Sequence, residues 1–233
     1  MPMPARSTTP HPYLSVDGRD RTLRTVSHRA TWKTTTHDWR SDLDLGHLTD
    51  VRRRLGPPGA AGGLRHLILE VLAYANDEAE SQGRPGHAIV IHQASGRVTV
   101  DDDGRGTDTR RDGDGRVLRK PVMATPDVRF IDQSHAPLLP DGLPRRGMST
   151  VAALSSELVH ENHREDGSWS QTYRYGIPDE GLAALEPRGW TGTSVSLRTE
   201  ITGPPALTAE DLTSFPSLNV EVLLPDNRSS RIQ

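Results

Sequence analysis

The stretch Val98–Asp108, VTVDDDGRGTD, joins a β-branched alternating run to three consecutive carboxylates and a Gly-Arg-Gly turn. The alternation predicts a strand, and the glycines predict a tight turn at its end. An acidic turn, a calcium loop and one wall of a nucleotide pocket are the three interpretations. A calcium loop of the EF-hand type does not fit, because counting from Asp101 puts Arg105 at the fifth ligand position and Asp112 at the twelfth, where glutamate is needed.

The segments before this stretch predict two helices. Residues 47–55 predict a short helix, and residues 63–83 predict the longest helix of the chain, because apolar side chains recur there at the i, i+3, i+4, i+7 spacing of one buried face. On the longer helix, His66, Glu70 and Tyr74 lie four residues apart and form a second stripe beside the apolar face. We therefore expect Glu70 at the margin of that buried face.

The rest of the chain predicts strands, short helices and one long loop. The strands are predicted over 87–93, 96–102, 159–164, 168–176, 191–199 and 218–226, and the helices over 147–158 and 208–215. Residues 103–146 are rich in Gly, Pro and Asp and predict a long loop, with one weak helical turn at 122–124. This order of elements predicts an α/β fold, a two-layer sandwich with one mixed, mostly antiparallel sheet and helices on one face.

Composition excludes several classes of protein. The 233 residues include no cysteine, which excludes a disulfide framework and a thiolate metal site. The net charge of −3, with both signs interspersed, argues against direct DNA binding through a basic surface. The sequence shows neither an apolar run of membrane-spanning length nor a signal-peptide core, so we expect no membrane association and a cytoplasmic location. The segment HENH at 160–163 lacks the spacing of a zinc motif.

Taken in order, these segments resemble the GHKL ATPases, the superfamily of gyrase B subunits, mismatch-repair ATPases, a chaperone and histidine kinases. The resemblance is greatest to the N-terminal ATPase domain of the DNA gyrase B subunit of bacteria, and it covers about residues 45–228. It rests on the pieces LTDVRRRLG, GLRHLILEVLAYANDEA, GRVTVDDDGRG, GMSTVAALSSEL, REDGSWSQTYRYG, TGTSVSLR and LNVEVLLPDNR. The resemblance implies the Bergerat fold of these ATPases, in a divergent and truncated form.

The resemblance assigns the opening stretch to an adenine pocket. Asp102 matches the adenine-binding aspartate, and a fixed carboxylate can accept a hydrogen bond from the exocyclic amine of adenine. Gly104 and Gly106 would let the backbone pass close to the base. Arg105 matches an arginine that lies against adenine and pairs with nearby carboxylates. Thr193 matches a hydroxyl that supports the same network.

The resemblance also assigns the catalytic stripe of the long helix. Glu70 matches the general base that orients the attacking water, and His66 matches the residue that holds it. A surface ion pair at i, i+4 is the alternative for these two residues. The family's magnesium-binding asparagine is replaced by Tyr74, a poor ligand for Mg²⁺. Asn76 lies about 200° around the helix and cannot take its place, so no metal ligand is expected.

The lid is the second departure from the family. The segment 141–149, DGLPRRGMS, corresponds to a glycine-rich turn whose amides and helix N-terminus hold the phosphates. Pro144, Arg145 and Arg146 occupy positions that the family keeps small. The two arginines could grip phosphate with their guanidinium groups or could form a solvated basic loop. The expected phosphate and lid residues are Lys120, Gly142, Arg145, Arg146 and Gly147, with Arg119 as a further source of positive charge.

These features predict a stand-alone gyrase-B-like domain that binds ATP or ADP, with weak or no hydrolysis, doubtful use of Mg²⁺ and no topoisomerase activity by itself. The chain is expected to stop where the family's second domain would begin, which is the reason to expect no topoisomerase activity. Residues 1–44 are expected to form a dimerising or partly disordered arm, residues 45–228 the ATPase-like domain and residues 229–233 a tail. A pseudo-ATPase interaction module, which forms a homodimer or pairs with a gyrase-type partner, is the alternative. A decoy that binds inhibitors of the gyrase ATP site ranks below both.

Overall fold

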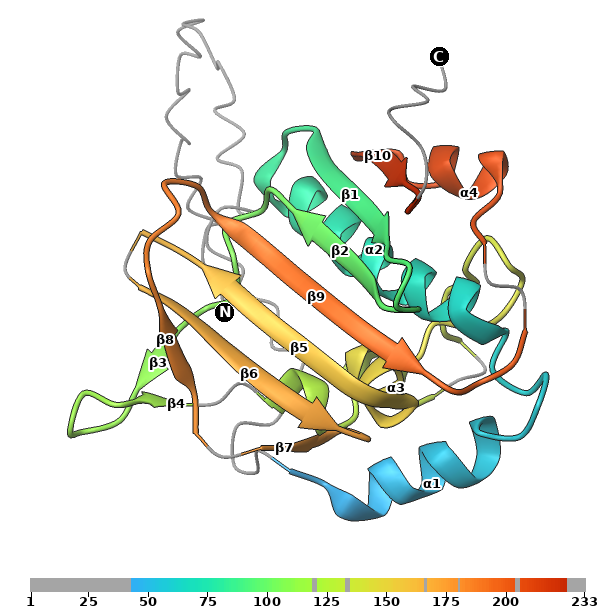
Figure 1. The fold of residues 1–233 in the computed structure, drawn as a ribbon, viewed down its shortest axis with the longest axis horizontal. Helices are drawn as coiled ribbons and strands as arrows, with labels where there is room; N and C mark the ends of the chain where they lie inside the picture. The colour runs from blue at the N-terminus through green and yellow to red at the C-terminus, as the bar shows by residue number, and fades with distance from the viewer. Residues whose placement is uncertain are drawn as a thin grey trace, which may run out of the picture. The chain divides into compact units, whose positions relative to one another are not determined.

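The computed structural model describes residues 43–118, 121–132, 135–165, 167–179, 181–203 and 206–225 (Figure 1). Of the arm expected over residues 1–44, only the last two residues are among them. The tail expected over residues 229–233 lies outside the described residues, as do Arg119 and Lys120.

One eight-stranded mixed sheet forms the first layer of the domain. Its order is β10-β1-β2-β9-β5-β6-β7, with β8 paired to β6. β1 and β10 run parallel, while the other neighbouring strands run antiparallel. The strands are β1 (Gly86–His92), β2 (Val98–Asp102), β5 (Ser155–His163), β6 (Ser168–Arg174), β7 (Ile177–Pro178), β8 (Ala183–Leu185), β9 (Gly192–Thr199) and β10 (Leu218–Leu223).

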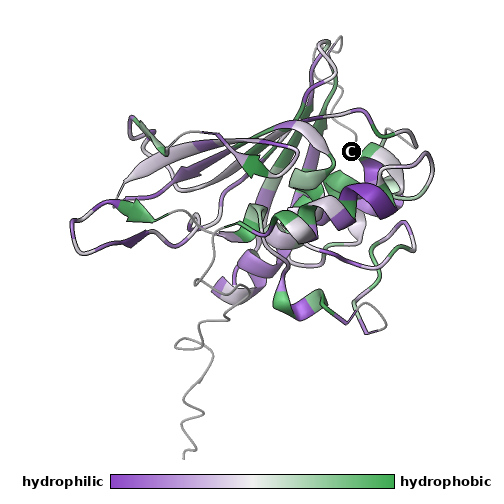
Figure 2. Cartoon of the chain, turned by 90° about the horizontal axis from the view of Figure 1, so that it is seen from below, coloured by the Kyte–Doolittle hydropathy of each residue, from purple (hydrophilic) through white to green (hydrophobic). Residues whose placement is uncertain are grey.

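Helices form the second layer, on one face of this sheet (Figure 1). They are α1 (Leu45–Leu55), α2 (Gly63–Gln82), α3 (Met148–Ala153) and α4 (Ala209–Thr213). The core lies between the layers, where Leu67, Ile68 and Leu72 of α2 are fully buried together with Val90 of β1. Figure 2 shows hydrophobic residues gathered where the helices face the strands. The predicted two-layer α/β sandwich is confirmed.

The longest helix buries its polar stripe as well as its apolar face. His66 and Glu70 are both fully buried, so the expectation that Glu70 lies at the margin of the buried face is wrong. The apolar side chains behave as predicted, but the segment that precedes α3 packs over the polar stripe and removes it from solvent. The helix ends at Gly83, whose left-handed backbone (φ 66°) lets its N–H reach the carbonyls of Ala79 and Glu80.

The helix predicted over 147–158 is also corrected. The structure has the short helix α3 over Met148–Ala153, and β5 begins at Ser155. Alternate residues of the following segment, Leu158 among them, pair with β9 and are buried. The small residues fit either conformation locally, so pairing with β9, distant in sequence, decides the boundary.

The long loop predicted over 103–146 contains short elements of its own. β3 (Arg110–Arg111) and β4 (Val117–Leu118) form a small hairpin. The 3₁₀ helices η2 (Pro121–Met123) and η3 (Val128–Phe130) follow. The weak helical turn expected at 122–124 therefore corresponds to η2, shifted by one residue. The side chains of η2 are buried and help close the core.

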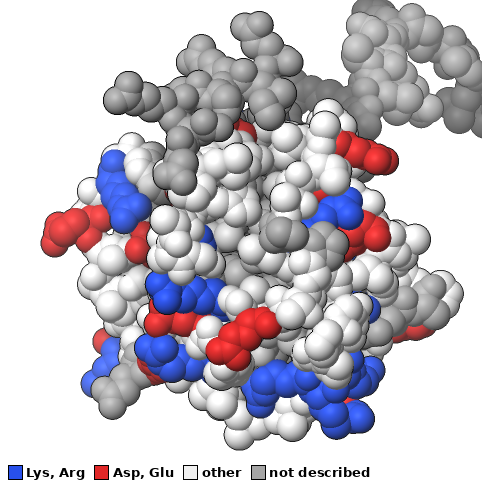
Figure 3. Space-filling view, turned by 45° about the vertical axis from the view of Figure 1, so that its right-hand side comes forward, with Lys and Arg blue, Asp and Glu red and all other residues white. Residues whose placement is uncertain are grey.

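Charged side chains of both signs are interspersed on the face of the domain shown in Figure 3. Elsewhere in the sheet, Arg97 and Arg174 both form ion pairs with Glu157. Within the described ranges, no helix combines the length and the apolar character needed to cross a membrane.

Candidate functional site

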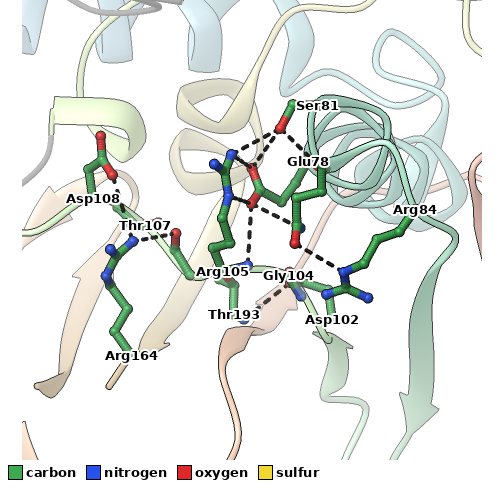
Figure 4. A network of polar contacts seen from close by, with 12 residues as sticks. Glu78, Ser81, Arg84, Asp102, Gly104, Arg105, Thr107, Asp108, Arg164 and Thr193 are labelled. Atoms are coloured by element: carbon green, nitrogen blue, oxygen red, sulfur yellow. Dashed lines mark hydrogen bonds and ion pairs between the residues drawn. The ribbon is translucent and has the colours of Figure 1, made fainter. Parts of the chain in front are cut away.

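Asp102 ends β2 on the side of the sheet that faces the helices, in line with the buried Val98 and Val100. Its Oδ1 accepts the backbone N–H of Gly104 at 2.9 Å and that of Thr193 at 3.3 Å (Figure 4). Burial raises the pKa of Asp102 to about 6, although these two amides favour the carboxylate and oppose the shift. The site therefore holds a carboxyl group that is costly to ionise and that titrates at higher pH than an ordinary aspartate.

An ion pair between Arg105 and Glu78 of α2 forms the rim of this site. Arg105 donates from Nε to Oε1 of Glu78 at 2.6 Å and from Nη2 to Oε2 at 3.1 Å, and it also reaches Ser81 Oγ at 2.9 Å (Figure 4). Burial alone would raise the pKa of Glu78, but Arg105 outweighs it and lowers that pKa. The expected carboxylate partner of Arg105 is thus Glu78, which the sequence pattern did not single out. Its position eight residues after Glu70 on the same helix was the available signal.

Two glycines allow the strands and turns around Asp102 to come close. A Cβ on Gly106, which has φ of +74°, would lie 2.7 Å from the carbonyl oxygen of His163 and 2.8 Å from Asn162 Oδ1. A Cβ on Gly192 would lie 1.9 Å from the carbonyl oxygen of Asp102. Only glycine fits at these positions. Asn162 Oδ1 also accepts the N–H of Thr107 at 2.5 Å and fixes the turn after β2.

Glu70 binds the backbone of the lid. Its Oε1 accepts the N–H of Arg146 at 2.5 Å, and its Oε2 accepts the N–H of Gly147 at 3.1 Å. His66 Nε2 lies 3.5 Å from Oε1 of the same carboxylate, and His66 Nδ1 lies 2.7 Å from Asp141 Oδ2. His66 and Glu70 therefore lie side by side, as expected. The lid amides that were expected to bind phosphate instead donate to the Glu70 carboxylate.

His66 lies between two carboxylates. Burial alone would lower the pKa of its imidazole, but the hydrogen bonds to Asp141 and Glu70 outweigh burial and raise the pKa above its usual value. Burial would raise the pKa of Asp141, and the contact with His66 lowers it below its usual value instead. The imidazole thus ties α2 to the start of the lid.

Tyr74 lies at the centre of a second polar cluster. Its hydroxyl donates to Asp127 Oδ2 at 2.5 Å. Arg129 bonds to Asp127 through Nη2 at 2.7 Å and to Asp77 through Nη1 at 2.9 Å. Burial and the charge of Asp127 raise the pKa of Tyr74, so its phenol is neutral at physiological pH.

Arg145 enters this cluster from the lid. Its Nη2 donates to Asp77 Oδ2 at 2.8 Å. Its guanidinium carbon lies 4.7 Å from the ring centre of Tyr74 and 4.9 Å from that of Phe130. Asp77, Asp127, Arg129 and Phe130 were not foreseen. Asp77 follows Glu70 by seven residues on α2, but nothing local marks the other three.

Several DNA gyrase B subunits are similar in sequence to this chain. The DNA gyrase B subunit of Mycobacterium tuberculosis is 36% identical over 154 residues, which are 65% of this chain and 22% of that protein. The mitochondrial DNA gyrase B subunit of Arabidopsis thaliana is 34% identical over 188 residues, 74% of this chain and 25% of that protein. The novobiocin-resistant DNA gyrase B subunit of Streptomyces niveus is 33% identical over 175 residues, 70% of this chain and 24% of that protein. This chain carries a gyrase-B-like GHKL domain.

The similarity has a limited extent. The chain spans about a quarter of the length of these gyrase proteins. No family model matches the chain. The gyrase-B-like domain therefore rests on the relatives and on the fold, in which the adenine-side residues expected from the sequence come together around Asp102.

The residues around Tyr74, the position expected to bind magnesium, are not suited to hold a magnesium ion. The Tyr74 phenol is neutral and donates its proton to Asp127, whereas Mg²⁺ prefers carboxylate, amide and water oxygens in octahedral geometry. The carboxylates nearby, Asp77 and Asp127, are already paired with arginines. Within the part of the chain that the structure describes, no group of three or more His, Asp or Glu side chains is arranged for a metal.

The two remaining lid residues, Gly142 and Arg146, form a turn and line a cavity. Gly142, with φ of +79°, forms the turn in which its N–H bonds to the Leu139 carbonyl. The side chain of Arg146 lines a cavity of about 460 Å³ beside α1, together with His47 and Arg54. Burial lowers the pKa of Arg146, and Arg54 adds to that effect. This cavity lies on the α1 side of the lid, among residues that the adenine assignment does not include.

Proposed function

We propose that this gyrase-B-like domain binds an adenine nucleotide, or a fragment of one, and hydrolyses ATP slowly or not at all. The observation that carries the proposal is the Asp102 carboxylate. Both amides that hold it bond to Oδ1, which leaves Oδ2 as the acceptor for the exocyclic amine of adenine. At the rim, the Arg105 guanidinium, which Glu78 holds in place, supplies a flat group on which the base can stack.

Slow or absent hydrolysis follows from the other half of the site. Phosphoryl transfer needs a metal, a phosphate-binding lid and a base that orients water, all held together. Here Glu70 is engaged by two lid amides, and Tyr74 stands at the expected magnesium position. The base is retained, but it is not free to hold a water molecule in this arrangement.

Calorimetric titration of the chain with ATP, ADP and adenosine, each with and without Mg²⁺, tests the proposal. We expect binding of at least one of these ligands in the wild type and loss of that binding in Asp102→Asn, together with release of phosphate from ATP near the uncatalysed background. Asp101→Asn is the matched control, because it removes the same charge from the opposite side of β2.

Two outcomes would contradict parts of the proposal. Magnesium-dependent ATP binding with steady turnover would mean that the domain is an active ATPase. If none of the three ligands bound, the adenine site itself would be refuted, and the fold would be left as an interaction module of the pseudo-ATPase kind.

A further inference from the structure

Polar side chains of α2 follow one line from the adenine site to the lid. Glu78, Tyr74 and Glu70 are spaced by four residues, so each step along this line is about 6 Å. Glu78 holds Arg105 beside Asp102 at one end, and Glu70 holds the lid amides at the other. A ligand whose base bonds to Asp102 and whose phosphates run along α2 would therefore place them beside Tyr74 and Glu70.

That space is filled by side chains of the protein. Arg145 is only 7% exposed and packs over the rings of Tyr74 and Phe130. Its Nη1 and Nη2 atoms donate to the two carboxylate oxygens of Asp77 at 3.1 and 2.8 Å. Bidentate pairing of this kind fixes the guanidinium in one geometry. The Arg145 side chain thus fills the space between the lid backbone and α2.

The charges in this region are balanced without a ligand. Two carboxylates, Asp77 and Asp127, face two guanidiniums, Arg129 and Arg145, so the formal charge of the cluster is zero. Glu70 supplies the anion for the lid amides. A triphosphate would bring several negative charges and would have to break these pairs, which leaves buried charges without partners. A ligand without phosphate groups would break none of them.

We propose that the ligand of this domain is an unphosphorylated adenine compound, adenine or adenosine, which binds at Asp102 while the Arg145 cluster stays closed. This inference rests on the proposed adenine site and narrows its ligand class. Arg145 and Glu70 act as positioning residues that hold the lid against α2. Asp102 accepts a hydrogen bond from the base, and the space where phosphates would lie stays filled by the Arg145 cluster.

A ligand series on the whole chain tests this inference. Adenine, adenosine, AMP and ATP are titrated calorimetrically, each with and without Mg²⁺. We expect adenosine to bind at least about ten-fold more tightly than ATP and Mg²⁺ to change neither affinity. ATP that binds as tightly as adenosine, or more tightly in the presence of Mg²⁺, would overturn the inference while leaving the adenine site intact. No binding of any of the four would overturn both.

The variant Arg145→Gly adds a second test. It removes the side chain that fills the space beside Tyr74, so the ratio of adenosine affinity to ATP affinity should fall by about ten-fold or more. Arg116→Ala, at the exposed tip of the β3–β4 hairpin, is the control and should leave the ratio unchanged. An unchanged ratio in a folded Arg145→Gly protein, checked by circular dichroism, would refute the inference. The wild-type series decides the question even if this variant does not fold.

Discussion

At the scale of single residues, Asp102 shows a conflict between stability and ligand binding. Its carboxyl is largely desolvated, which raises its pKa to about 6. Because that pKa is raised above the unfolded value of about 3.9, the folded state binds the proton more tightly, and stability falls as pH rises from about 4 to 6. At pH 7.5 the protein carries this penalty in order to present an ionised acceptor.

We therefore predict that Asp102→Asn stabilises the protein at pH 7.5 while abolishing adenine binding. The asparagine carbonyl can still accept the Gly104 and Thr193 amides, and it removes the buried charge. The gain should be on the order of 1 kcal/mol, or a rise in Tm of about 2–4 °C. Thermal denaturation at pH 7.5 and pH 4.5 measures it, and the gain should be clearly smaller at the lower pH, where the Asp102 carboxyl of the folded protein is mostly protonated. A lower Tm at pH 7.5 would contradict this account.

Tyr74 offers a second prediction at this scale. Tyr74→Phe keeps the ring under Arg145 and Arg129 but deletes the hydroxyl that donates to Asp127. Because the acceptor is a buried carboxylate, the loss should destabilise the protein by about 1–3 kcal/mol. Urea denaturation measures the change, with Tyr175→Phe as the control, since Tyr175 is 41% exposed. Equal effects of the two variants would mean that the short hydrogen bond contributes nothing.

At the scale of elements, α2 connects both halves of the site, and its contribution could be predicted in part. The four-residue spacing placed His66, Glu70 and Tyr74 on one stripe, and the structure agrees. Their partners could not be predicted, because Asp127, Arg129 and the lid amides reach α2 from an irregular segment whose path depends on tertiary contacts. The boundary between α3 and β5 was missed for a similar reason, since the pairing with β9 overrides local preference.

The anchoring of the lid on α2 leads to a prediction about Glu70. Glu70→Gln keeps one carbonyl acceptor but loses the charge and turns an amide donor toward a backbone N–H, so the lid should be held less firmly. Hydrogen exchange at the Arg146 and Gly147 amides should become about ten-fold faster or more, which corresponds to about 1.4 kcal/mol. Glu80→Gln, on the exposed side of the same helix, should leave that exchange unchanged. Unchanged exchange in Glu70→Gln would show that these hydrogen bonds do not hold the lid.

At the scale of the whole molecule, the order of elements and the two-layer architecture could be predicted, whereas the closed state of the site could not. Sequence patterns report burial and periodicity, which sufficed for the sheet and for α2. Whether Arg145 and Arg146 would bind a phosphate, face solvent or fill the site depends on where Asp77 and Phe130 lie in the folded chain. The sequence showed arginine at lid positions 145 and 146, but only the structure shows that Arg145 fills the space beside Tyr74.

The His66 contacts join two distant segments, and the stability of the whole fold should therefore depend on their protonation. Asp141 and Glu70 face the imidazole from the lid and from α2, and the Arg146 guanidinium lies 3.4 Å from Nε2. Because the pKa of His66 is raised in the folded state, its stabilising effect is fully present below the unfolded pKa of about 6.5 and is lost as pH rises through the folded pKa.

We predict that His66→Gln destabilises the protein more at pH 5.5 than at pH 8.5, as measured by urea denaturation. His87→Gln on β1 removes only a half-exposed contact with Glu221 at 3.9 Å and should show a much weaker dependence, because solvent screens such pairs. A destabilisation of His66→Gln that is larger at pH 8.5 would mean that the imidazole is held in its neutral form, and that Arg146 rather than the carboxylates sets its charge.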